Sequence, residues 1–262
     1  MSNDPFAPYG IQHLSPSTCN LFIGSPASFV LDKCMKRKGQ VGAAAHRGTA
    51  TEKGVVHGLE TGATDEECIK VAKDEFWRLM ALSSDPAAEK EEAAVPEMVK
   101  IGLKELRGYG KPTSAQGKIE YRFDSLAVPF IGYYDVEWAN HNILVDLKTT
   151  HALPSKISTN HARQVSLYAA ARSASLAGDA AARGNAIDPR VAYITPKKSA
   201  TYRVENVSEH VKALERIGLA IQRFLSISTD PMELAKHVMP DVDSFYFKDP
   251  MARQAVFEIW GV

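Results

Sequence analysis

FIGYYDVEWANHNILVDLKTT, residues 130–150, is the stretch that decides the fold. Residues 133–138 and 143–149 are rich in β-branched and aromatic side chains, which favour strands. The four residues between them, 139–142, are Ala-Asn-His-Asn, a composition that favours a turn. The stretch therefore predicts a β-hairpin.

The predicted hairpin brings charged side chains together. If it turns between Asn140 and His141, Asp135 lies opposite Asp146, with Cβ atoms about 5 Å apart. Lys148 shares their face because strand side chains alternate. Like charges at this separation disfavour ionisation, and a divalent cation offsets that cost. Hard oxygen ligands suit Mg²⁺ or Mn²⁺. The alternative is a surface hairpin with a cross-strand ion pair.

The composition is that of an ordinary globular chain. Of 262 residues 45% are hydrophobic, and 31 basic residues balance 31 acidic ones. A single domain over 1–262 is expected. Because the net charge is zero, any nucleic-acid contact must come from local patches. Cys19, Cys34 and Cys68 lack metal-binding spacing and suggest reduced thiols. With no long apolar run or signal-peptide core, we expect a cytoplasmic protein with no membrane partner.

The rest of the chain predicts helices around a sheet. A loose arm is expected over 1–14, and a helical part over 15–106. Its helix N-caps are predicted at Ser15, at Thr49 or Thr51, and at Asp65, and Ser25-Pro26 is expected to restart the first helix. Further strands are predicted over 118–123, from 127, and over 190–195 and 199–204, and helices over 158–177 and 208–226. This order predicts an α/β fold. Its core, 116–204, is a central mixed β-sheet flanked by helices, with N-terminal and C-terminal helical additions, the latter ending in an aromatic tail within 205–262.

Four motifs resemble a known family. GYYD (132–135) and VDLKTT (145–150) resemble the G-x-x-D and D-x-K signatures of the PD-(D/E)-X-K nucleases, in the RecB-like and viral exonuclease branch. QVSLY (164–168) resembles the Q-x-x-x-Y motif of this branch, and LSPSTCNLFIGSPASFVL (14–31) resembles its opening helix pair. The resemblance covers roughly residues 11–200 and implies a restriction-endonuclease-like core.

The resemblance implies a metal-dependent catalytic site. Asp135, Asp146 and the Leu147 carbonyl would hold Mg²⁺, with Mn²⁺ as a substitute. Lys148 would orient the attacking water or stabilise the charge that develops. The alternative role for Lys148 is that of a structural counter-ion.

A helix-borne ligand is expected from the region after Gly48. Relatives often carry a His four residues after this Gly, where this chain has Glu52, an acceptable hard ligand. We predict Glu52 as the ligand. His57, five residues further on, does not share its helix face cleanly and is expected to be a satisfied or surface histidine.

Other polar residues are assigned supporting roles. Gln164 and Tyr168 share a helix face and, by the resemblance, hold the nucleic-acid backbone or order the site. The alternative is a packed tyrosine with a neighbouring amide. Candidate phosphate contacts are Arg47, Lys53, Arg163 and Lys197, each of which can instead be merely solvated. Glu120 is left open between a supporting and a solvent-facing role.

One departure from the branch excludes a cofactor. Cluster-bearing members have Cys-Pro where this chain has Ser25-Pro26, and no cysteine follows Cys68. We therefore expect no iron–sulfur cluster. No Walker A sequence is present, so no nucleotide cofactor or motor is expected.

These features together predict an Mg²⁺-dependent deoxyribonuclease, an exonuclease acting on DNA ends in recombination, repair or viral DNA processing. The alternatives are a structure- or sequence-selective endonuclease of the same fold, and a non-catalytic DNA-binding protein that retains it. Expected partners are DNA and a single-strand annealing or other recombination protein. A homo-oligomeric ring is a further possibility, in which the tail 245–260 packs on a neighbour. The alternative, which stays open, is that this tail completes the core of its own chain.

Overall fold

The computed structural model describes residues 4–176 and 186–262. Contacts group the chain into two compact units. Unit 1 comprises Met1–Gln40, Glu120–Gly132 and Ser208–Val262, and unit 2 comprises Val41–Ile119 and Tyr133–Val207. The predicted C-terminal helical addition therefore falls in unit 1 from Ser208 onward, whereas the predicted helical part 15–106 is divided between the units.

The central element is a five-stranded sheet in the order β1-β2-β3-β4-β5. The strands are β1 (Ser114–Tyr121), β2 (Phe130–Trp138), β3 (Ile143–Thr149), β4 (Asp188–Ile194) and β5 (Ser199–Arg203). β2 and β3 are antiparallel, β3 and β4 are parallel, and β4 and β5 are antiparallel. This confirms the predicted α/β architecture with a mixed sheet and flanking helices.

The hairpin has the predicted register. Val136 pairs with Val145 and Trp138 with Ile143. A 3₁₀ turn at Ala139–His141 connects the strands, and its Asn142 has φ 52°, a left-handed value that Asn tolerates. The β2–β3 ladder stops at Val136, whereas β3 pairs with β4 along its whole length. The two hairpin strands therefore separate beyond this point.

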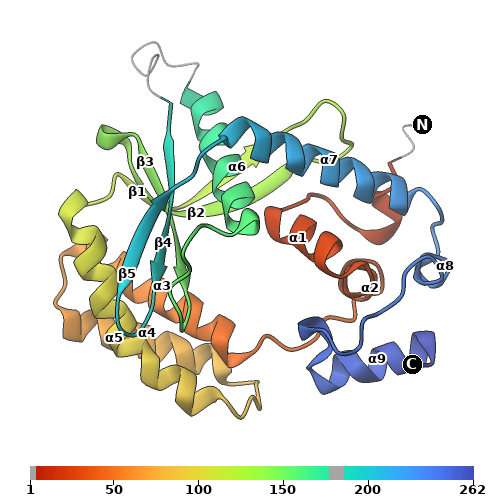
Figure 1. Cartoon of the computed structure of the whole chain (residues 1–262), viewed down its shortest axis with the longest axis horizontal. Coiled ribbons are helices and arrows are strands. Elements are labelled where there is room, and N and C mark those ends of the chain that lie inside the picture. Colours follow the sequence, from red (N-terminus) through yellow and green to blue (C-terminus); the bar gives the residue numbers. More distant parts are fainter. Residues whose placement is uncertain (1–3, 177–185) are drawn as a thin grey trace. The chain divides into compact units, whose positions relative to one another are not determined.

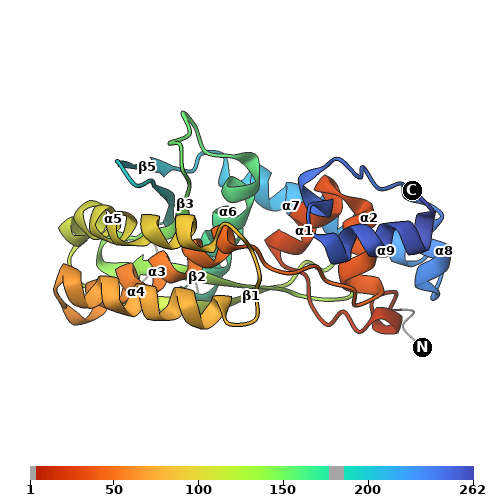
Figure 2. The ribbon, with the colours of Figure 1, turned by 90° about the horizontal axis from the view of Figure 1, so that it is seen from below.

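Helices cover both faces of the sheet in unit 2 (Figures 1 and 2). One face packs on α3 (Ala43–Thr61) and α5 (Ala88–Leu106), and α4 (Asp65–Met80) packs against these two helices. Their shared core with the sheet includes Val136, Trp138, Val145, Leu147, Ala192 and Ile194. The other face meets α6 (Thr159–Leu176). Because strand side chains alternate, the residues between these core positions, Asp135 and Asp146 among them, face α6.

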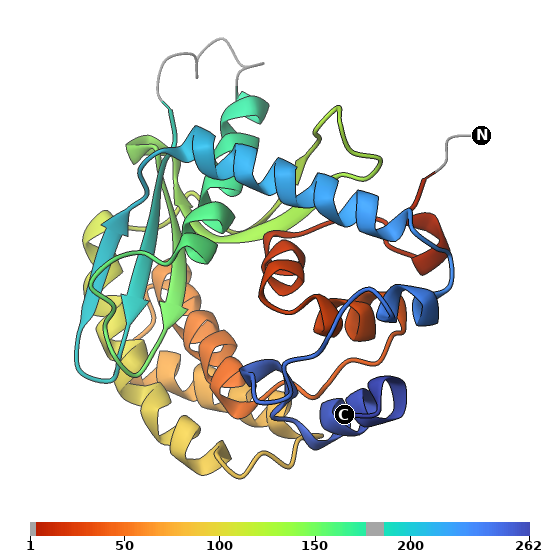
Figure 3. The ribbon, with the colours of Figure 1, turned by 45° about the vertical axis from the view of Figure 1, so that its right-hand side comes forward.

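Unit 1 joins helices from both ends of the sequence. It contains α1 (Pro16–Gly24), α2 (Pro26–Phe29) with a π-helical turn at Val30–Cys34, α7 (Val207–Leu225), α8 (Pro231–Ala235) and α9 (Pro250–Trp260). In Figure 3 the red N-terminal and dark-blue C-terminal segments lie side by side. Their common core includes Leu31, Phe247 and Val256.

The aromatic tail packs on its own unit at two points. Phe247 is 1% exposed, and Trp260 Nε1 donates to the carbonyls of Ala235 and Val238. Phe245 and Phe257 remain exposed. Phe247 and Trp260 therefore follow the alternative in which the tail completes the core of its own chain.

Three sequence expectations are wrong in detail. Residues 4–14 are not a loose arm, because Phe6 and Leu14 are fully buried. Helix α3 begins at Ala43 rather than near Thr49, since the preceding alanines favour helix, and Thr51 is buried in mid-helix. The cap of α4 is Thr64, in a capping box with Glu67.

Other boundaries agree closely. Ser15 caps α1 as predicted, and the helix restarts at Ser25-Pro26 as predicted, with Ser25 as the cap of α2. Helix α7 coincides with the predicted helix 208–226 to within one residue. The predicted end of the helix 158–177, Ala177, lies outside the described residues. Among the described helices, none has the length and apolarity needed to cross a membrane.

Candidate active site

The two hairpin aspartates lie where β2 and β3 separate. The ladder register, extended by one pair beyond Val136 and Val145, puts Asp135 opposite Asp146. The backbone N–H of Leu147 donates to Asp135 Oδ2 over 2.6 Å. Both carboxyl groups are nearly buried, with 7% of Asp135 and 1% of Asp146 exposed. The sheet therefore carries two acids at a point where its own hydrogen bonding changes.

Lys148 completes the predicted set. Its Nζ lies 2.5 Å from Asp146 Oδ2. Burial lowers the pKa of Lys148, but the charges of Asp146 and Asp135 raise it by more. The net result is a pKa above the usual value. The ammonium group therefore stays protonated beside the carboxylates.

Glu52 reaches the same place from α3. Its carboxylate accepts a hydrogen bond from the Gln116 side chain on β1 and interacts with Asp135. Burial raises the pKa of Glu52; the Gln116 hydrogen bond opposes this, and the charge of Asp146 adds to it. Gln116 has φ 52°, so a strained backbone residue positions this amide.

The surroundings of Asp135 disfavour its ionised form. Burial raises its pKa well above the usual range, and the negative charges of Asp146 and Glu52 raise it further. The Lys148 charge and the Leu147 N–H act in the opposite direction without cancelling the effect. The cluster therefore holds more negative charge than its own cation balances.

Gln164 and Tyr168 lie beside Asp146, and their supporting role stays a prediction. Gln164 Nε2 donates to Asp146 Oδ1 over 3.3 Å and to Tyr168 Oη over 2.9 Å. Burial and the charge of Asp146 raise the pKa of Tyr168, so the phenol keeps its proton. Helix α6 thus orients one of the two central carboxylates.

The chemistry of this donor set fits a hard divalent cation. Carboxylate oxygens and a nearby main-chain carbonyl are the ligands that Mg²⁺ and Mn²⁺ prefer, and the uncompensated charge of the acids favours a cation. Within residues 4–176 and 186–262, no three His, Cys, Asp or Glu side chains already form a group arranged to hold a metal. Instead, Lys148 holds Asp146, Gln116 holds Glu52 and the Leu147 amide holds Asp135.

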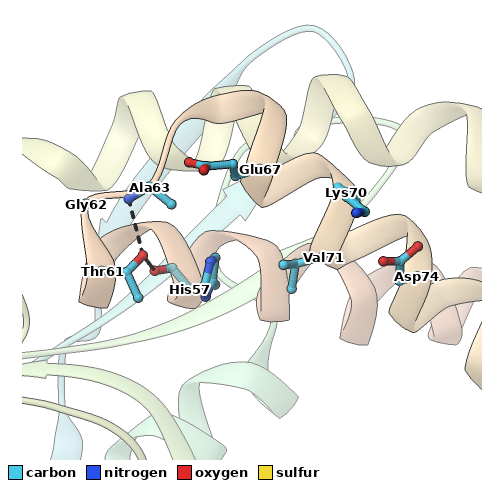
Figure 4. Close-up of a pocket in the computed structure, with 8 residues that line it drawn as sticks. All are labelled: His57, Thr61, Gly62, Ala63, Glu67, Lys70, Val71 and Asp74. Atoms are coloured by element: carbon cyan, nitrogen blue, oxygen red, sulfur yellow. Dashed lines mark hydrogen bonds between the residues drawn. The ribbon is translucent and has the colours of Figure 1, made fainter.

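His57 lies apart from this cluster. It lines a pocket between α3 and α4 (Figure 4) together with Thr61, Gly62, Ala63, Glu67, Lys70, Val71 and Asp74. Its carbonyl accepts a hydrogen bond from Thr61 Oγ1. Of the two candidate helix-borne ligands, Glu52 is the one beside the aspartates.

Arg47 is not placed to contact a phosphate. It is 4% exposed and forms an ion pair with Glu91, which is also buried. Its guanidinium also donates to the Thr149 carbonyl over 3.4 Å and lies 2.8 Å from His151 Nε2. The prediction of a nucleic-acid contact overlooked Glu91, 44 residues away in the sequence.

The other three basic candidates differ in accessibility. Lys53 is half-exposed and pairs with Glu75 over 2.7 Å. Arg163 is partly buried in α6 and contacts Asn160 over 3.5 Å, whereas Lys197 is exposed in the β4–β5 turn. Glu120, left open by the sequence, is exposed and pairs with Arg122. Nucleic-acid contacts from Lys53, Arg163 and Lys197 stay predictions.

The sequence reasoning missed two residues of this region. Gln116 had no sequence signal, because its role depends on an unusual backbone angle. His161 had one, since it precedes Gln164 by three residues and shares its helix face. Its Nδ1 lies 2.7 Å from Tyr193 Oη.

The sequence matches no family model and no curated protein. One solved structure, described as "Crystal structure of SSO0001", is similar over 55% of this chain and 68% of its own, with 16% identity and a TM-score of 0.32. A likeness at this score carries no argument about the fold or function of the present chain.

Proposed function

We propose that this chain is a divalent-metal-dependent deoxyribonuclease of the PD-(D/E)-X-K type. The observation that carries the proposal is the meeting of Glu52, Asp135 and Asp146 beside Lys148 at the separation of β2 and β3. A buried acid with a raised pKa and a neighbouring charge partner is a common mark of a functional site. An exonuclease acting on DNA ends in recombination, repair or viral DNA processing is the form that the motif resemblance favours.

Each side chain has a definite task in this proposal. Glu52, Asp135, Asp146 and the Leu147 carbonyl would hold the cation. When bound, Mg²⁺ supplies a Lewis acid for the phosphate and lowers the pKa of a coordinated water. Lys148, which remains protonated, donates to the attacking water or to the phosphate oxygens as negative charge develops.

Helix α6 prepares the acids for this task. Gln164 donates to Oδ1 of Asp146 and so fixes the orientation of the carboxylate, while Oδ2 pairs with Lys148. Tyr168 in turn holds the Gln164 amide. This arrangement pre-organises one acid before any cation or substrate arrives.

A non-catalytic DNA-binding protein is the second candidate, favoured by a separate observation. Although the three acids lie near one another, no three His, Cys, Asp or Glu side chains among the described residues are arranged to hold a metal, and Gln116 and the Leu147 amide hold Glu52 and Asp135 separately. In this alternative Lys148 is only the counter-ion of Asp146.

Cleavage assays separate these candidates. End-labelled linear duplex DNA and covalently closed circular DNA are incubated with the purified protein and Mg²⁺ or Mn²⁺. An exonuclease releases nucleotides from the linear DNA only, and an endonuclease also cuts the circle. Absence of cleavage of either DNA with both metals contradicts the nuclease proposal and leaves the binding protein.

A further inference from the structure

A histidine next to the acids has no place in the site as described so far. His161 is in the first turn of α6, and its partner Tyr193 is the β4 residue directly paired with Lys148. The His161 and Tyr193 rings have centroids 5.6 Å apart. The imidazole therefore lies beside Lys148, on the sheet face that carries Asp146.

The hydrogen bonds of Tyr193 determine which imidazole nitrogen carries the proton. Tyr193 Oη accepts the backbone N–H of Ser158 over 3.2 Å and lies 2.7 Å from His161 Nδ1. A phenol has one proton to donate. Among the described residues, Nδ1 is the acceptor within reach of that proton. Nδ1 therefore accepts from Tyr193, and the neutral ring carries its proton on Nε2.

The surroundings keep this ring neutral. Burial, followed by the charge of Lys148, lowers the pKa of His161 to about 4, against a weaker opposing effect of Asp146. A charged imidazolium would be drawn to Asp146 and would compete with Lys148. The neutral ring does not compete, so its Nε2–H remains available to another acceptor.

No acceptor for that N–H is present in the part of the chain that the structure describes. Nε2 has no hydrogen-bond partner there. It is also not one of the buried polar atoms that lack a partner, so solvent can reach it. It is thus an accessible donor next to a protonated lysine. Neighbouring neutral and cationic donors suit an oxygen that carries a delocalised negative charge.

We propose that His161 Nε2–H and the Lys148 ammonium group form a two-donor site for a non-bridging oxygen of a nucleic-acid phosphodiester. The inference rests on the proposed function for its substrate class and adds His161 as a substrate-contacting residue. Tyr193 acts as a positioning residue that sets the tautomer.

Two substitutions separate the donor from the packing. His161→Asn places an amide near Nδ1, which keeps the contact with Tyr193 but removes the Nε2 donor. His161→Gln places an amide N–H near Nε2, which keeps the donor but loses the Nδ1 acceptor. Each protein is measured for thermal unfolding, for kcat and KM on linear DNA with Mg²⁺, and for binding of fluorescein-labelled oligothymidylate in EDTA.

Because His161→Asn removes a hydrogen bond to a charged acceptor, we expect it to lose about tenfold in oligothymidylate affinity and in kcat/KM. His161→Gln is expected to stay within about threefold of wild type in both, because it keeps the donor. An oligomer with neutral methylphosphonate linkages should bind the wild type and His161→Asn equally weakly.

The outcomes distinguish the two proposals. If the wild type cleaves and binds but His161→Asn equals it, or His161→Gln is the weaker variant, the His161 inference is wrong and the nuclease proposal stands. If the wild type neither cleaves nor binds the oligomer, the proposed function fails and the inference falls with it. If both variants lose affinity and kcat/KM equally and unfold at a lower temperature, His161 has a purely structural role and the His161 inference is wrong.

Discussion

At the residue scale, Asp135 shows how a proposed metal-binding residue can oppose stability. Asp135 is 7% exposed and faces Asp146 and Glu52. Burial and then the charges of these two acids hold its pKa above the usual value. In a metal-free protein the ionised form is therefore disfavoured in the folded state more than in the unfolded state. The residue proposed to bind a cation destabilises the fold that carries it.

Asp135→Asn should raise the stability of the metal-free protein at neutral pH. The pKa of Asp135 in the folded state lies above the ordinary 3.8, so the folded state binds more protons than the unfolded state. The stability of the wild type therefore falls as the pH rises from 3.8 through the folded-state pKa. Asn removes the charge and can still accept the Leu147 N–H. Urea unfolding in EDTA at pH 4 and pH 8 measures both proteins. A variant less stable than wild type at pH 8 contradicts the prediction.

Asp146→Asn should abolish cleavage while keeping the fold. The change removes one proposed metal-binding charge without altering shape, and a loss of about 4 kcal/mol of transition-state stabilisation corresponds to about a thousandfold in rate. Linear DNA with Mg²⁺ is the assay, with circular dichroism to check the fold. Glu120→Gln, at an exposed acid that pairs with Arg122, is the matched control and should cleave normally. A near wild-type rate for Asp146→Asn removes Asp146 from the site.

Glu52→Gln and His57→Ala should behave differently. Glu52 interacts with Asp135 and Asp146, so its loss should raise the Mg²⁺ concentration needed for half-maximal cleavage by about tenfold. His57 lines the separate pocket of Figure 4, and its loss should leave the requirement unchanged. Mg²⁺ titrations of the cleavage rate measure both variants. The reverse ranking moves the helix-borne ligand to His57.

At the element scale, a buried ion pair anchors α6 to β2. Arg172 donates from Nε to both oxygens of Glu137 over 3.2 and 3.1 Å, and Glu137 is 1% exposed. Tyr134 Oη adds a hydrogen bond to the same carboxylate, and its ring occupies the space that a Cβ on Gly117 would need. The helix that carries Gln164 is thereby tied to the strand that carries Asp135.

Arg172→Met should destabilise the protein by about 3 kcal/mol, because it leaves the Glu137 carboxylate buried without its cation. The double variant Glu137→Gln with Arg172→Met should recover part of that loss, since no buried charge remains. Urea unfolding of the single and double variants measures the difference. A double variant less stable than Arg172→Met assigns the loss to packing instead of charge.

The hairpin was predictable because its information is local. Alternating strand formers and four turn residues fix the register, and the register alone places Asp135 opposite Asp146. Arg47 was misjudged because its partner Glu91 comes from another helix. The positive φ of Gln116 and the contact between His161 and Tyr193 arise from tertiary packing, which the local sequence pattern does not predict.

At the scale of the whole molecule, each unit is built from separated segments. In unit 1, a Cβ on Gly218 of α7 would lie 2.7 Å from Leu126 and 3.4 Å from Leu14, and the Phe22 and Phe224 rings are 5.6 Å apart. Helix α7 therefore covers apolar residues from two earlier segments. The chain crosses between the units after residues 40, 119, 132 and 207.

A chain truncated after Val207 should fail to fold as a soluble monomer. It keeps every proposed site residue, yet it removes α7 and exposes Leu14, which is fully buried in the intact chain. Size-exclusion chromatography with light scattering compares it with the 28.7 kDa full chain. A monodisperse truncated protein with cooperative unfolding contradicts this dependence.

The bond between the Leu147 amide and the Asp135 carboxylate provides a spectroscopic reporter. Its amide proton points at an oxygen whose charge changes on protonation or on cation binding. In a ¹⁵N-labelled protein, the chemical shift of this one amide should follow the ionisation of Asp135 and respond to added Mg²⁺ without any DNA present. The state of the acid cluster is then readable from a single backbone resonance, before catalysis is ever assayed.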